Sequence, residues 1–140
     1  MSTIQQGKIT SRTIGQNLFI AILGLHALGC YGLGLTALVN PKIAFETGFQ
    51  IAYQPEFKII GLIIGMLLLF LGSIAVLGIV WTRKKQLHGI YAGLAVGMHL
   101  FLFGIVAFVL MGETDPLWVD SIRGFLTFVF GYMAYKELKN

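Results

Sequence analysis

The stretch IIGLIIGMLLLFLGSIAVLGIVW, residues 59–81, decides the class of protein to which this chain belongs. It holds no charged residue, and a helix that crosses the hydrocarbon core of a bilayer needs about 20 predominantly apolar residues. Stretches of similar length and character cover residues 17–39, 89–111 and 117–134. Strands of a membrane barrel would instead alternate in polarity over about 10 residues. We therefore expect an all-α membrane protein built as a four-transmembrane-helix bundle.

The composition of the chain agrees with this class. Of its 140 residues, 56% are hydrophobic and only 11% are charged, which is more apolar surface than a soluble domain of this size can bury. The four stretches also leave almost no chain for a soluble domain. We expect one membrane domain, residues 1–140, with helices over about 12–39, 55–81, 87–112 and 116–137.

The distribution of basic residues predicts the orientation, because short loops rich in lysine and arginine stay cytoplasmic. Such residues precede the first apolar stretch, separate the second from the third, and follow the fourth: Lys8, Arg12, Arg83, Lys84, Lys85, Lys136 and Lys139. We expect a multi-pass protein of the bacterial cytoplasmic (inner) membrane with both termini in the cytoplasm. The net charge of +4 then reflects orientation, and no nucleic-acid partner is expected.

A short segment follows the first apolar stretch. Asn40 and Pro41 are typical of a helix start, and Gly48 of a helix end, so residues 41–47 could form a short helix in the membrane interface. Its apolar residues would then face lipid: Ile43, Ala44 and Phe45, with Phe49 and Ile51. The alternative is a loop packed over the end of the bundle.

Glycines within the apolar stretches predict close helix packing. Gly61 and Gly65, and likewise Gly93 and Gly97, have the spacing of small residues that lets two helix backbones approach in lipid. This spacing serves packing within the bundle, or a dimer or docking surface for a larger partner.

Two histidines lie alone in apolar stretches. His26 and His99 each follow a basic residue, Arg12 and Lys85, by 14 positions, so we expect them at one depth near the bilayer midplane on parallel helices. They are candidate axial ligands of one haem b or of a chlorin, because two neutral imidazoles can hold both faces of such a ring. The alternatives are imidazoles that hydrogen-bond neighbouring helices, and proton transfer.

Other chemistry has less support. No carboxylate lies at the depth of the two histidines, so no metal site is expected apart from a haem iron. No nucleophile with its base, phosphate-binding loop or acid pair is recognisable, so an enzyme is not expected.

A polar group lies nearer the outer surface. Asp120 and Arg123 are three residues apart on one expected helix, so they can pair along one face, and Thr127 would continue that polar stripe. The two residues can form a structural ion pair. Alternatively, Asp120, Arg123 and Lys58 are a candidate site for an anionic lipid headgroup or substrate. The second possibility is that of a small transporter or lipid-binding protein.

The first 80 residues resemble a known family. The residues that carry the likeness are Leu38, Val39, Asn40, Pro41, Phe45 and Gly48, then Pro55, Phe57, Gly61 and Gly65. They are similar to small four-helix DoxX-like bacterial membrane proteins. The resemblance implies a four-helix bundle and a membrane subunit that passes electrons near quinone, and it transfers no site residue.

These patterns together predict a small integral membrane subunit or accessory protein without catalysis of its own. Its partners are expected to be the lipid bilayer and other membrane proteins, or further copies in a homo-oligomer. The alternatives are a bis-histidine electron-transfer protein and a small transporter or lipid-binding protein.

Overall fold

The computed structural model consists of helices, which hold 91% of the chain, and its described part contains no strand. The structure describes the backbone of residues 3–48, 50, 52–111 and 115–139. Within these ranges, it describes the side chains of residues 14–48, 50, 52–106, 109 and 119–139.

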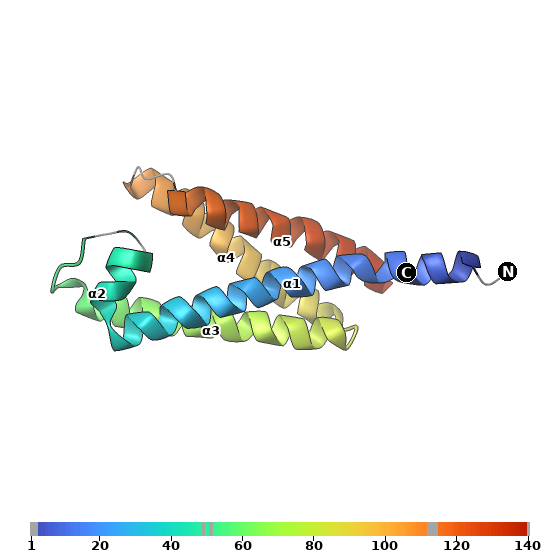
Figure 1. The fold of residues 1–140 in the computed structure, drawn as a ribbon, viewed down its shortest axis with the longest axis horizontal. Helices are drawn as coiled ribbons and strands as arrows, with labels where there is room; N and C mark the ends of the chain where they lie inside the picture. The colour runs from blue at the N-terminus through green and yellow to red at the C-terminus, as the bar shows by residue number, and fades with distance from the viewer. Residues whose placement is uncertain (1–2, 49, 51, 112–114, 140) are drawn as a thin grey trace. The chain divides into compact units, whose positions relative to one another are not determined.

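The helices follow one another through short connections (Figure 1). In chain order they are α1 (Thr3–Val39), α2 (Pro41–Ile43), the π-helix η1 (Ala44–Gly48), α3 (Phe57–Arg83), α4 (Leu87–Met111) and α5 (Asp115–Lys139). Three segments within them are long and apolar enough to cross a membrane: Ile14–Val39, Phe57–Arg83 and Leu87–Val106. These three contain most of the first three stretches expected from the sequence.

The helix α5 includes the fourth expected stretch, residues 117–134, but it is not one of these three segments. Its described part carries Asp120 and Arg123 among apolar residues, and these charges lower its mean hydropathy.

The chain divides into two compact units. One consists of Met1–Gly24 and Ala75–Asn140, and the other of Leu25–Ile74. We call them the first and second unit. The first has a core in which Phe19 and Leu23 of α1, Ile90 of α4 and Ala134 of α5 are fully buried.

In the first unit, a tight turn joins α3 to α4. The N–H of Gln86 donates to the Trp81 carbonyl at 2.9 Å, and the N–H of Lys85 donates to the Thr82 carbonyl at 2.9 Å. This pair of bonds is the Schellman motif that ends many helices. Its left-handed position, φ 56°, is occupied by Lys85 where glycine is usual.

The start of α2 is as predicted. The Asn40 side chain accepts a hydrogen bond from the N–H of Ile43 at 3.3 Å, and Pro41 is the first helical residue. Helical backbone then continues through η1 to Gly48. Ahead of α3, Pro55 and Glu56 form a turn that leads into the helix at Phe57.

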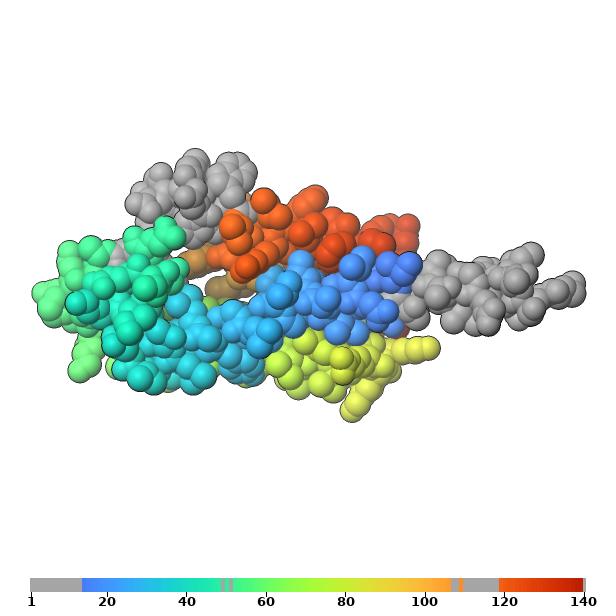
Figure 2. All heavy atoms as spheres, in the orientation of Figure 1, coloured from blue at the N-terminus to red at the C-terminus, as the bar shows by residue number. Residues whose placement is uncertain are grey.

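The expected lipid-facing side of this segment was wrong for Ala44 and Phe45. Both are buried within the second unit, and the Phe45 ring lies 5.4 Å from that of Phe57 and 6.0 Å from that of Tyr53, between centroids. Gly61 on α3 leaves room for the Phe45 ring, since a Cβ there would lie 3.1 Å from Phe45 Cε2. Figure 2 shows α2 and η1 gathered beside the end of α1. The predicted members Phe49 and Ile51 lie outside the described residues.

Close glycine contacts occur inside each unit. In the second, a Cβ on Gly34 of α1 would lie 3.0 Å from the Gly65 carbonyl oxygen of α3. In the first, a Cβ on Gly124 of α5 would lie 2.7 Å from the Gly97 carbonyl oxygen of α4. At Gly65 and Gly97, two of the four predicted positions, the small residue serves packing within the chain.

Candidate functional site

The two histidines occupy different surroundings. His26 lies on α1 in the second unit and is buried, with 3% of its surface exposed, and Cys30 one turn later is buried as well. His99 lies on α4 in the first unit and is exposed. The pair as axial ligands of one haem or chlorin stays a prediction, because each histidine belongs to its own unit.

His99 is part of an apolar face of α4. Its ring stacks on that of Phe103 one turn later, with centroids 6.4 Å apart and planes inclined by 16°. Met98, Leu102 and Phe103 are between 43% and 48% exposed, whereas Gly97 and Gly104, on the opposite side of the helix, are buried. We call Met98, His99, Leu102 and Phe103 the His99 face. It lies within the apolar segment Leu87–Val106.

The predicted acid–base pair of α5 is present. An Arg123 nitrogen lies 3.7 Å from an Asp120 carboxylate oxygen, and the two side chains are 48% and 25% exposed. Such an exposed pair contributes little to stability. Thr127 does not continue this stripe, because it is fully buried and its hydroxyl donates to the Arg123 carbonyl at 2.8 Å. Lys58 is exposed near the start of α3 in the second unit, so its part in an anion site stays a prediction.

A carboxylate that no sequence pattern predicts joins two helices of the first unit. The Glu137 carboxylate on α5 accepts hydrogen bonds from the N–H of Gly15 at 2.8 Å and of Gln16 at 2.9 Å. These amides lie where the apolar part of α1 begins, at Ile14. No local spacing could have predicted this contact, because its partners are more than 120 residues apart.

A second polar contact that no sequence pattern predicts lies within the second unit. The Tyr31 hydroxyl on α1 is 3.0 Å from the Ser73 hydroxyl on α3, and Ser73 donates to the Leu69 carbonyl at 2.9 Å. Hydrogen bonds of this kind hold helices together in lipid.

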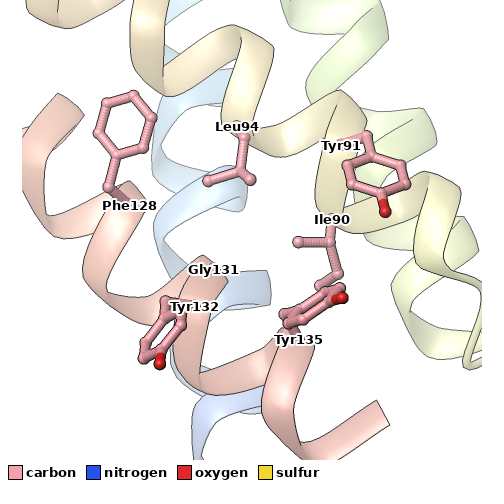
Figure 3. Close-up of a pocket in the computed structure, with 7 residues that line it drawn as sticks. All are labelled: Ile90, Tyr91, Leu94, Phe128, Gly131, Tyr132 and Tyr135. Atoms are coloured by element: carbon pink, nitrogen blue, oxygen red, sulfur yellow. The ribbon is translucent and has the colours of Figure 1, made fainter. Parts of the chain in front are cut away.

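A groove of about 460 Å³ lies between α4 and α5 in the first unit (Figure 3). Its lining is apolar and aromatic: Ile90, Tyr91, Leu94, Phe128, Gly131, Tyr132 and Tyr135. The close approach of the helices at its floor depends on Gly131, where a Cβ would lie 2.8 Å from Leu94. We call it the α4–α5 groove. Its volume falls in the range of about 300–1,000 Å³ that is usual for small-molecule sites.

The described residues contain no group of three or more His, Cys, Asp or Glu side chains able to hold a metal ion. Comparison of the chain with protein families, with curated proteins and with solved structures finds no match.

Proposed function

We propose that this protein is a small integral membrane subunit or accessory protein that docks onto a membrane partner through the His99 face. One observation carries the proposal: an imidazole is exposed within an apolar helix segment that is long enough to cross a bilayer. Three apolar side chains surround it on the same face.

The energetic argument starts from the cost of a polar group in hydrocarbon. An imidazole that faces lipid without a hydrogen bond costs about 1–3 kcal/mol. A partner helix that accepts or donates a hydrogen bond would remove this cost, while Met98, Leu102 and Phe103 would supply the packing contact. The His99 face therefore has the composition of a helix–helix contact, with one polar residue among apolar ones.

The topology belongs to the same proposal. We take α5 as the fourth membrane-crossing helix, because its 25 residues extend about 37 Å, more than the hydrocarbon thickness of about 30 Å. Arg123 is half exposed and can extend its charge toward the membrane surface. Both termini would lie in the cytoplasm of a bacterium, and the protein in its inner membrane. The DoxX-like resemblance, which implies a membrane subunit, is part of this proposal.

Photo-crosslinking in native membranes tests the docking proposal. A benzophenone amino acid in place of Leu102, on the His99 face, should form a discrete protein adduct. The matched control places it at Leu67 of α3, which is exposed to a similar extent at 55% against 47%. An adduct of twice the chain mass of 15.4 kDa would identify a second copy as the partner, and any other mass a different protein. Lipid adducts alone at Leu102 would overturn the proposal.

A further inference from the structure

We propose that the α4–α5 groove binds one acyl chain of an anionic phospholipid, whose phosphate lies at Lys136 and Lys139. The proposal is independent of the His99 face. It rests on the lining of the groove, on the cations at its mouth, and on the direction of the nearby acidic side chain.

The groove has an apolar part and a polar part. Leu94 and Phe128 line one end, and Tyr132 and Tyr135 line the other, nearer the end of α5 (Figure 3). Tyrosines of this kind are enriched where a membrane protein passes from hydrocarbon to headgroups. An amphiphile with an apolar tail and a polar head fits this order better than a wholly apolar molecule does.

Two lysines stand at the tyrosine end. Lys136 Nζ lies 4.7 Å from the centre of the Tyr132 ring, and Lys139 Nζ lies 5.4 Å from that of Tyr135. Lys139 also donates a hydrogen bond to the Tyr135 hydroxyl at 3.2 Å. This hydrogen bond raises the pKa of Lys139, the last residue of α5. Two ammonium groups held by ring faces favour an anionic headgroup over a zwitterionic one.

The neighbouring carboxylate is directed away from these two lysines. Glu137 directs both of its oxygens to the backbone amides of Gly15 and Gln16. It lies about 100° around the helix from Lys136 and about 160° from Lys139, by helical geometry. The basic turn between α3 and α4, with exposed Arg83, Lys84 and Lys85, lies at the same end of the first unit (Figure 1). At the tyrosine end of the groove, two lysines therefore lie on the tyrosine rings, and the one neighbouring carboxylate is bound to α1.

Native mass spectrometry of the detergent-purified protein, titrated with phosphatidylglycerol or phosphatidylcholine, tests the inference. We expect phosphatidylglycerol to bind more tightly, and the double variant Lys136→Gln, Lys139→Gln to weaken its binding about tenfold. Phosphatidylcholine binding should not change. The matched control, Lys84→Gln with Lys85→Gln, removes the same charge from the same end of the unit and should change binding less than twofold.

A second measurement uses the unaltered protein, so it does not depend on whether a variant folds. Phosphatidylglycerol with a diazirine on its acyl chain should label Tyr91, Phe128 and Tyr132 more strongly than the exposed α3 residues Met66 and Phe70. Equal labelling of both sets would overturn the inference, as would equal losses in the two double variants.

Discussion

Glu137 and Gly15 tie the end of α5 to the start of the apolar part of α1, through a carboxylate–amide hydrogen bond of 2.8 Å. A second oxygen of the same carboxylate accepts from Gln16. Each hydrogen bond to a charged acceptor contributes about 1.5–3 kcal/mol to stability. Because Glu137→Ala removes both bonds, we expect it to lower the free energy of unfolding by about 3–6 kcal/mol in a denaturing-detergent titration. Glu137→Gln should lower the free energy of unfolding by about half of this amount, because the glutamine side chain keeps one oxygen that can accept a hydrogen bond. The exposed Glu56→Gln serves as the control, and an equal loss there would show that the contact contributes nothing specific.

The contact of α4 with α5 depends on glycine at its closest point. A Cβ on Gly124 would lie 2.7 Å from both the Gly97 carbonyl oxygen and the Phe101 nitrogen, which are backbone atoms. Gly124→Ala should therefore destabilise the protein by about 1–3 kcal/mol. Gly29→Ala is the matched control, because, apart from the neighbouring backbone of its own helix, no atom of the described structure lies within 4 Å of a Cβ built there. It should be neutral or raise stability by up to about 1 kcal/mol. Similar losses at both positions would contradict the packing described here.

A substitution in the turn between α3 and α4 is expected to stabilise the protein. Lys85 adopts φ 56°, a conformation that glycine reaches without the steric cost of a Cβ. Lys85→Gly should raise the free energy of unfolding by about 0.5–1 kcal/mol. Lys84→Gly, one residue earlier, should not stabilise, because its backbone needs no glycine. A loss of stability in Lys85→Gly would argue against the Schellman geometry.

The roles proposed for the two histidines predict that the purified protein carries no haem and is colourless. His26 is buried in the second unit, and His99 stacks on Phe103 at the exposed side of α4. We expect both imidazoles to take part in helix contacts and not to bind haem iron. Protein expressed with sufficient haem should therefore show no Soret band in its visible spectrum. A Soret band and a reduced α band that disappear in both His26→Ala and His99→Ala would establish the bis-histidine hypothesis instead.

The sequence predicted the features that depend on local composition. Long apolar stretches predicted the helices, and Asn40 with Pro41 predicted the start of α2, because a helix and its cap depend on residues a few positions apart. Asp120 and Arg123 interrupt the otherwise apolar stretch of α5, which is not one of the three segments in the described residues that are long and apolar enough to cross a membrane. Helical spacing alone predicted that these two side chains would pair.

Features that depend on distant partners could not be predicted in this way. Phe45 was expected to face lipid, but α3 returns beside it and Gly61 makes room for its ring. The Glu137 contact and the Tyr31–Ser73 contact likewise join residues that no spacing rule relates. The exposure of His99 depends on which side of α4 the neighbouring helices cover, and its sequence neighbours are apolar on every side.

The central claim is that His99 makes a polar contact with a membrane partner, and one comparison tests it most directly. The photo-crosslinked adduct formed from position 102 should be measured in native membranes with His99, with His99→Gln and with His99→Ala. Interhelical hydrogen bonds in membranes are worth about 0.6–1.7 kcal/mol, so His99→Ala should weaken binding of the partner, and with it the yield of the adduct, about three- to eighteenfold. His99→Gln, which keeps a donor and an acceptor, should retain part of it. An adduct that is equally strong in all three proteins would contradict the claim.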